Sequence, residues 1–179
     1  MHDIQFNRQG IASIANFIES PNQDARPDDS DLSLVVIHNI SMPPGQYGGN
    51  GVIELFTNTL DSDGHPYYAE VHQLKVSSHF FIRRDGELIQ FVACSQRAWH
   101  AGVSNWQGRE RCNDFSVGIE LEGSDADTFE DAQYDVLNCL LATLKKTYPI
   151  TDIVGHSDIA PGRKTDPGPH FDWSRIINN

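Results

Sequence analysis

The chain has 179 residues, of which 39% are hydrophobic and 21% are charged, the profile of one ordinary globular domain. Its formal net charge of −12 at pH 7 would repel nucleic acid and anionic membranes, so we expect neither as a partner. The first residues lack a basic start before a long apolar core, and no later stretch is long enough to cross a bilayer. We therefore expect the protein to stay in the cytoplasm. We also expect a monomer.

The first part of the chain predicts a few short elements. Weak apolar periodicity over residues 11–18 predicts a short helix, and the polar residues 22–31 predict a surface loop. The apolar run 34–37 predicts a strand buried on both faces, which places His38 at its carboxyl end. The glycine-rich segment 42–51 lacks the Gly-Lys-Ser/Thr ending of a phosphate-binding loop, so we interpret it as a flexible active-site loop.

A second helix and a hairpin are predicted next. The helical spacing of apolar residues over 52–60 predicts the helix. Residues 79–82 and 88–92 flank Asp85-Gly86, which is the strongest short signal for a β-hairpin. We therefore expect two adjacent antiparallel strands in this part of the chain.

The last third of the chain predicts the longest helix, over residues 131–148. Thr128 is its expected cap, and one apolar stripe would face the core. Ile153-Val154 predicts a short strand that delivers His156, and Phe171-Asp172-Trp173 leads into a brief terminal helix. The sequence contains no sign of a repeat, a coiled coil or an interdomain linker.

The cysteines Cys94, Cys112 and Cys139 are an odd, scattered set without a CxxC pair. This spacing argues against a disulfide framework and against a thiolate metal cage. We expect reduced thiols that pack inside the protein.

The segment 155–169 is the most informative part of the chain, because glycines, prolines and a lysine surround His156 and Asp166. A neutral imidazole and a carboxylate are both good ligands for Zn²⁺, and glycines and prolines can fix the loop that aims them. His38 would supply a third ligand, since α/β sheets place functional groups at the carboxyl ends of strands. Three protein ligands with a fourth position left for water form the catalytic arrangement of zinc.

Each of these residues also has a simpler interpretation. His38 taken alone can be a structural residue at a strand end, and the prolines around Gly168 can make Asp166 a turn residue. Asp158 and His170 are rival ligands by proximity, and spacing alone does not exclude them.

Glu120 is the candidate general base. Glu120 and Glu122 alternate with Ile119 and Leu121, so the two carboxylates would project from one face of a strand. A metal-bound water needs an acceptor for its proton during attack on a carbonyl, and we predict that Glu120 takes this role. The alternative interpretation is an exposed strand carboxylate.

Three other residues have side chains suited to substrate or transition-state contacts. Lys164 would direct a cation at the oxygen that becomes negative in a tetrahedral intermediate, although lone loop lysines are usually solvated. Trp99 suits stacking against a sugar ring and equally suits covering a core edge. Arg111 carries a guanidinium in an acidic protein and suits bidentate capture of a carboxylate.

Several blocks of the sequence together closely resemble the AmpD-type N-acetylmuramoyl-L-alanine amidases. The blocks are His38-Asn39-Ile40-Ser41 followed by Pro43-Pro44-Gly45, Ile82-Arg83-Arg84-Asp85-Gly86, Ala98-Trp99-His100-Ala101-Gly102, the run 108–116, Gly118-Ile119-Glu120-Leu121-Glu122-Gly123 and Arg163-Lys164-Thr165-Asp166-Pro167-Gly168-Pro169. The likeness runs from about Asp24 to Trp173. It implies a single zinc amidase domain over residues 1–179. The implied fold is α/β, a central mixed sheet flanked by helices, as in phage lysozyme-like amidases and peptidoglycan recognition proteins.

The resemblance also implies a site and a reaction. The zinc ligands of the family match His38, His156 and Asp166, its carboxylate base matches Glu120, and its carbonyl-polarising lysine matches Lys164. The implied reaction is hydrolysis of the amide between the lactyl group of 1,6-anhydro-N-acetylmuramic acid and L-alanine in muropeptides. It belongs to peptidoglycan recycling in the cytoplasm.

Substrate contacts are implied for a smaller set of residues. Asn39 and Arg111 fall in blocks that match substrate-binding positions of the family. Lys75 stands where the resemblance predicts an arginine, so it keeps the charge but loses the bidentate fork.

Two other functions are consistent with these residues. The first is a muropeptide-binding module without catalysis, because relatives of this fold have lost ligands and become receptors. The presence of every ligand type together with Glu120 and Lys164 favours an enzyme. The second is a zinc amidase that acts on the intact wall.

Overall fold

The computed structural model describes residues 4–28 and 31–176, and its centre is a mixed sheet with the strand order β1-β5-β4-β9-β3-β10. The strands are β1 (Asn16–Phe17), β3 (Leu34–Ile40), β4 (Phe80–Ile82), β5 (Leu88–Gln90), β9 (Ser116–Glu122) and β10 (Asp152–Gly155). β4, β9, β3 and β10 run parallel to one another, and β5 runs antiparallel to β4. Neighbouring parallel strands therefore end at the same edge of the sheet.

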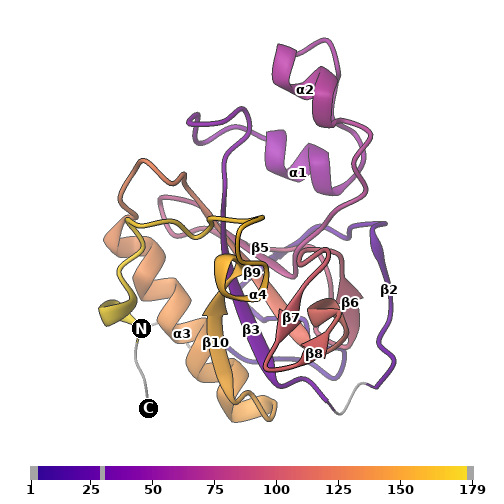
Figure 1. The fold of residues 1–179 in the computed structure, drawn as a ribbon, viewed down its shortest axis with the longest axis vertical. Helices are drawn as coiled ribbons and strands as arrows, with labels where there is room; N and C mark the ends of the chain where they lie inside the picture. Colours follow the sequence, from indigo (N-terminus) through magenta and orange to yellow (C-terminus); the bar gives the residue numbers. More distant parts are fainter. Residues whose placement is uncertain (1–3, 29–30, 177–179) are drawn as a thin grey trace.

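Smaller elements surround this sheet (Figure 1). The short strands are β2 (Gln23–Ala25), which pairs with β6 (Gln96–Ala98), and β7 (Asn105–Trp106), which pairs with β8 (Arg109–Glu110). The helices are α1 (Gly51–Phe56), α2 (Pro66–Val71), α3 (Asp131–Thr147), α4 (His156–Ile159), η1 (Cys112–Asp114) and η2 (Trp173–Arg175). α3 lies to one side of the central strands and β6, β7 and β8 to the other, while α1 and α2 stand beyond the carboxyl end of β3.

The core explains why β3 is apolar throughout. Val35 and Ile37 belong to the cluster that α3 covers, whereas Leu34 and Val36 belong to a second cluster on the opposite face of the sheet. A strand packed on both faces has no solvent side, so it needs a continuous apolar run. The predicted strand, which continues through His38 to Ile40, is therefore confirmed.

Other sequence predictions are confirmed as well. The hairpin forms between β4 and β5, with Gly86 at a φ of 87° in its turn. α1 overlaps the predicted helix over residues 52–60, since it begins at Gly51 and ends at Phe56, and α3 closely matches the predicted long helix. β10 delivers His156, and the three cysteines are free thiols with Cys94 and Cys112 buried. No helix in the described ranges is long and apolar enough to span a membrane.

Three predictions were wrong or incomplete. Residues 11–18 form no helix, because Ala12 bridges to Phe6 and β1 pairs with β5, so the sheet supplies the hydrogen bonds that a helix would have made. The polar stretch 22–31 contains β2, and its residues 29–30 lie outside the described residues.

The long helix begins later than its predicted cap. Glu130 occupies the position before the helix, where its N–H donates to Oε1 of Gln133 at 3.0 Å. Thr128 lies two residues earlier, and its carbonyl oxygen accepts a hydrogen bond from Arg84 at 3.1 Å. The pairing of cap and third helical residue is therefore made by a glutamate and a glutamine instead of a threonine.

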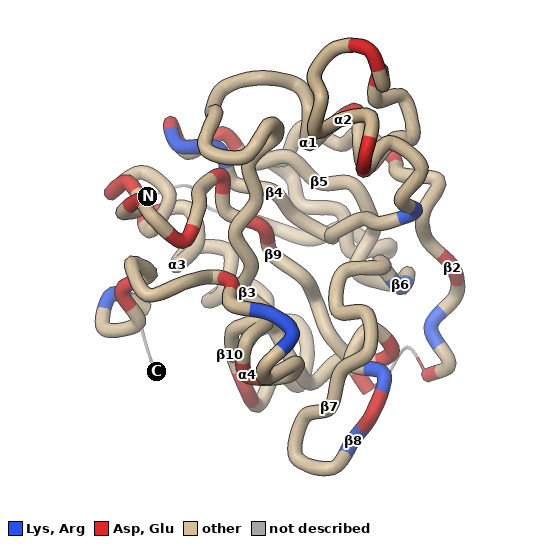
Figure 2. Tube along the Cα trace, turned by 45° about the horizontal axis from the view of Figure 1, so that its top comes forward, with Lys and Arg blue, Asp and Glu red and all other residues tan. Residues whose placement is uncertain are grey.

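The charge of the molecule is spread over its surface. Figure 2 shows the basic residues in short, separate groups among acidic residues.

Candidate metal centre

Strand register brings the candidate residues to one edge of the sheet. His38 on β3 pairs directly with Glu120 on β9, and Gly155 on β10 pairs with Ile37. His156 follows Gly155 and begins α4, so it comes next to His38. Directly paired residues of neighbouring strands point to the same face of a sheet. Asp166 arrives from the following loop, where its carbonyl oxygen accepts the N–H of Ser157 at 2.9 Å.

Three ligand atoms converge at this edge. Nδ1 of His38 lies 3.0 Å from Nδ1 of His156 and 2.9 Å from Oδ2 of Asp166, and the last two atoms are 3.0 Å apart. Zinc lies about 2.0–2.1 Å from such ligands, so a tetrahedral site separates two of them by about 3.3 Å. The spacing and the chemistry of this trio therefore fit zinc. Within the described part of the chain, this is the one group of histidine, cysteine and acidic residues able to hold a metal.

Hydrogen bonds show which nitrogen of His156 is free to bind a metal. Its Nε2 lies 3.0 Å from the carbonyl oxygen of Ala101, and a carbonyl only accepts. The ring proton of neutral His156 therefore lies on Nε2, which leaves the lone pair of Nδ1 directed at His38 and Asp166.

The site favours neutral histidine and ionised aspartate. Burial lowers the pKa of His38 to about 4, against a smaller opposing effect of Asp166, so the ring is neutral at pH 7. Burial alone would raise the pKa of Asp166, but its contacts with His156 and His38 outweigh burial and hold that pKa well below its ordinary value. These are the protonation states that metal ligands need.

The two carboxylates of β9 have different surroundings. Glu120 and Glu122 are both buried, with 7% and 4% of their surface exposed. Glu122 accepts the N–H groups of Gly48 at 2.6 Å and Arg84 at 3.1 Å, so each of its oxygens is occupied. Oε2 of Glu120, in contrast, has no hydrogen-bond partner among the described residues. The alternative interpretation of Glu120 as an exposed strand carboxylate is therefore wrong.

The pKa of Glu120 is shifted in the direction that suits a general base. Burial, reinforced by the Asp166 carboxylate, raises the pKa of Glu120 well above its ordinary value, and Lys164 opposes that shift. A raised pKa makes the carboxylate a stronger proton acceptor. Glu120 also lines the cleft described next.

A cleft of about 650 Å³ opens over these residues. Its polar part includes the three candidate ligands, Glu120 and the exposed Lys164. Its apolar wall contains Ile40, Met42, Leu55, Phe56, Tyr67, Val71, Leu74, Val76 and Trp99. An apolar wall beside convergent polar groups is typical of a small-molecule site.

The predicted substrate contacts lie in different places. Asn39 and Trp99 line the cleft, and Nδ2 of Asn39 donates to Oδ1 of Asp125 at 2.7 Å. Arg111 is 71% exposed, lines a separate cavity of about 540 Å³, and its Nε lies 3.3 Å from Oδ2 of Asp114. Lys75 is exposed and does not line the cleft. Substrate contacts by these residues stay predictions.

The rival ligands do not join the trio. Oδ2 of Asp158 accepts the N–H of Gly155 at 2.7 Å, which fixes the first turn of α4. His170 is exposed and outside the group.

The sequence reasoning missed the surroundings of the ligands. Nδ1 of His100 lies 3.0 Å from Nε2 of His38, and Asn113 holds the backbone beside it. Both residues occur in the blocks described above, but no local pattern distinguishes His100 from the other histidines. The contact depends on the packing of the loop after β6 against β9, which is not a local property of the sequence.

Comparisons with known proteins place this geometry in context. The family model for N-acetylmuramoyl-L-alanine amidase matches residues 28–169. The 1,6-anhydro-N-acetylmuramyl-L-alanine amidase AmpD of Salmonella typhimurium is 58% identical over 164 residues, which cover 90% of this chain and 88% of that protein. AmpD of Escherichia coli is 54% identical over 170 residues, which cover 94% of this chain and 93% of that protein.

Solved structures agree with these relatives. The crystal structure of a selenomethionine derivative of AmpD matches with a TM-score of 0.93 at 53% identity, covering 96% of this chain and 97% of that one. The complex of the Escherichia coli amidase AmiD with anhydro-N-acetylmuramic acid-L-Ala-D-gamma-Glu-L-Lys matches with a TM-score of 0.61 at 28% identity, covering 97% and 64%. The expected amidase fold is confirmed. Because the family model and the relatives match most of its length, the chain belongs to the N-acetylmuramoyl-L-alanine amidase family, whose members are hydrolases.

Proposed function

We propose that the protein is a zinc-dependent amidase of peptidoglycan recycling. It would hydrolyse the amide between the lactyl group of 1,6-anhydro-N-acetylmuramic acid and L-alanine in muropeptides. The observation that carries the proposal is the convergence of His38, His156 and Asp166 within 3.0 Å of one another, in the same cleft as Glu120.

The chain's own residues divide the chemistry among them. Zinc held by the trio would act as a Lewis acid toward the scissile carbonyl and would acidify water. Glu120 accepts the proton of the attacking water through its free oxygen and returns it to the departing nitrogen of L-alanine. The ammonium group of Lys164 stabilises the negative charge that develops on the carbonyl oxygen.

The cleft supports a substrate that is part sugar and part peptide. Its apolar wall, including Trp99 and Tyr67, offers area for a sugar ring, while Asn39 offers an amide to a peptide. Anhydro-muropeptides are the compounds in the names of the AmpD relatives and in the AmiD complex. These compounds combine a sugar ring with a peptide, which is consistent with the groups that line the cleft.

We further propose that the enzyme is a monomer, that it forms one zinc amidase domain over residues 1–179, and that it works in the cytoplasm. The free thiols of Cys94, Cys112 and Cys139 support a reducing compartment. Sedimentation of the purified protein and fractionation of cells test these points.

The function is tested by metal analysis combined with two substrates. Purified protein should contain about one zinc per chain and release L-alanyl peptide from anhydro-muropeptide. Chelation should abolish the release, and added zinc should restore it. Full activity after complete chelation would contradict zinc dependence. Release from whole sacculus alone would make the intact wall the substrate, and binding without release would make the protein a receptor.

A further inference from the structure

The loop after β6 contacts both histidines of the proposed zinc site. Nδ1 of His100 lies 3.0 Å from Nε2 of His38, and the carbonyl oxygen of Ala101 lies 3.0 Å from Nε2 of His156. Two consecutive residues therefore hold the ring nitrogens that face away from the proposed metal position.

The order of protons along this contact is determined by its two ends. Nδ1 of His38 must be unprotonated to bind a metal, so the ring proton lies on Nε2 and is donated to His100. Nδ1 of His100 then accepts, and the remaining proton of His100 lies on Nε2. That nitrogen lies 3.1 Å from Oγ of Ser116, which can accept it. The ring N–H groups of His38 and His100 each have an acceptor in this arrangement.

We propose that His100 is a positioning residue that fixes the tautomer and the ring orientation of His38. The proposal rests on the proposed zinc site. Outer partners of ligating histidines raise ligand basicity and typically contribute 10–100-fold to metal affinity.

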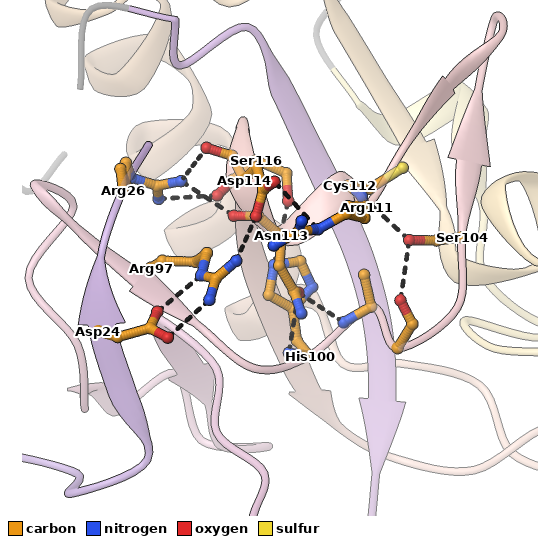
Figure 3. Close-up of polar contacts among 12 residues, drawn as sticks. Asp24, Arg26, Arg97, His100, Ser104, Arg111, Cys112, Asn113, Asp114 and Ser116 are labelled. Carbon is orange, nitrogen blue, oxygen red and sulfur yellow. Dashed lines mark hydrogen bonds and ion pairs between the residues drawn. The ribbon is translucent and has the colours of Figure 1, made fainter. Parts of the chain in front are cut away.

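The backbone around His100 is held for this purpose (Figure 3). Oδ1 of Asn113 accepts the N–H groups of His100 at 3.1 Å and Ala101 at 2.8 Å, so a single side chain fixes both contacts to the histidines. The buried Arg26 donates to the carbonyl oxygens of Asn113 at 3.1 Å and Ser116 at 2.8 Å. Asn113, which accepts the N–H of His100, and Ser116, which contacts Nε2 of His100, are thus both bound by the Arg26 guanidinium.

Gly118 provides the space for the ring. A Cβ at this position of β9 would lie 2.5 Å from Cγ of His100, closer than real Cβ contacts come. The His100 ring therefore rests directly on the backbone of β9, two residues before Glu120. This close approach fixes the ring between the strand and His38.

Substitutions at His100 test the proposal because they separate the acceptor from the ring. His100→Phe keeps the ring and removes the acceptor. His100→Asn keeps an oxygen at the position of Nδ1, and His100→Gln offers its polar atoms near the position of Nε2 instead. His72→Phe is the control, since Nδ1 of that histidine lies 3.2 Å from the carbonyl oxygen of Tyr68 and 3.0 Å from that of Ala69, and His72 is not part of the trio. Zinc affinity is measured by competition with a chromophoric chelator, and folding is checked by circular dichroism in excess chelator.

The expected results differ for each variant. His100→Phe and His100→Gln should bind zinc roughly 10–100-fold more weakly than wild type, whereas His100→Asn and His72→Phe should stay within a few-fold. If His100→Phe does not fold, His100→Gln carries the comparison with His100→Asn. Wild-type affinity in the folded Phe or Gln variant, or an equal loss in the Asn variant, would overturn the role of His100. If wild type itself binds no zinc, the proposed function fails instead.

Discussion

Replacing Glu120 with glutamine should separate catalysis from stability. The amide keeps the shape of the carboxylate but cannot accept a proton from water at neutral pH. Positioned proton transfer contributes roughly 10²–10⁴-fold. The value of kcat should fall by that factor, which corresponds to about 3–5 kcal/mol of barrier. Zinc content should stay at the wild-type level, because Glu120 is not one of the grouped ligands.

The same substitution should change the pH dependence of folding in the metal-free protein. Burial raises the pKa of Glu120, so the folded protein keeps a proton that the unfolded chain has already released. The stability from such a group is complete below the unfolded pKa of about 4.3 and is lost as the pH rises through the folded pKa. Glutamine does not titrate. The free energy of unfolding of the variant should therefore rise relative to that of wild type by up to about 1.4 kcal/mol per pH unit over this window.

Two measurements check this pair of effects. Turnover of anhydro-muropeptide is measured at equal zinc content, and urea unfolding in excess chelator is measured from about pH 5 to about pH 8. Glu122→Gln is the matched control: its oxygens accept two backbone N–H groups, so it should lose about 1–3 kcal/mol of stability. Undiminished turnover in Glu120→Gln would refute its role as base. A stability difference that does not vary with pH would refute the account of its burial.

Three further predictions concern the ligands and their surroundings. Asp166→Ala should contain no zinc after dialysis. Asp158→Ala should retain zinc, because the Asp158 carboxylate accepts the N–H of Gly155 and is not a ligand. Zinc retained by Asp166→Ala would contradict the ligand assignment. Asn113→Ala should weaken zinc binding in chelator competition. Asn113→Asp should preserve it, because aspartate keeps an acceptor for the N–H groups of His100 and Ala101. A zinc affinity of Asn113→Ala equal to that of wild type would contradict the role of Asn113. Burial lowers the pKa of His79 well below its ordinary value, so its contribution to stability is complete above the unfolded pKa of about 6.5 and is lost as the pH falls. Urea unfolding of the metal-free protein should show that His79→Phe loses less stability than wild type between about pH 7 and about pH 5.5.

Strong local signals made part of the fold predictable. The apolar run before His38 has no solvent face, and Asp85-Gly86 fits a tight hairpin turn, so each predicted its element from a few residues. The strand-end rule indicated His38, the composition of segment 155–169 indicated His156, and the family resemblance indicated both. The structure brings their Nδ1 atoms to 3.0 Å.

The remaining features depend on partners that are distant in the sequence. β1 and β2 are short strands that exist because β5 and β6 lie beside them, and no periodicity marks them. Alternation along β9 predicted the face of Glu120 but not its burial, which depends on the cleft walls. The contact of His100 with His38 requires the bare backbone of Gly118, a position that reads as an ordinary strand residue.

The proposed base lies on β9, one proposed ligand lies on β3 and a second directly follows β10, and these three parallel strands are adjacent. Their separations are consequently governed by the interstrand repeat of about 4.8 Å, which backbone ladders keep constant. Sliding β3 by one residue would turn His38 toward α3 and dismantle the centre. The coordination geometry is thus preassembled by the scaffold, and metal loading should be a filling step without refolding. Far-ultraviolet circular dichroism spectra of chelated and zinc-loaded protein should superimpose.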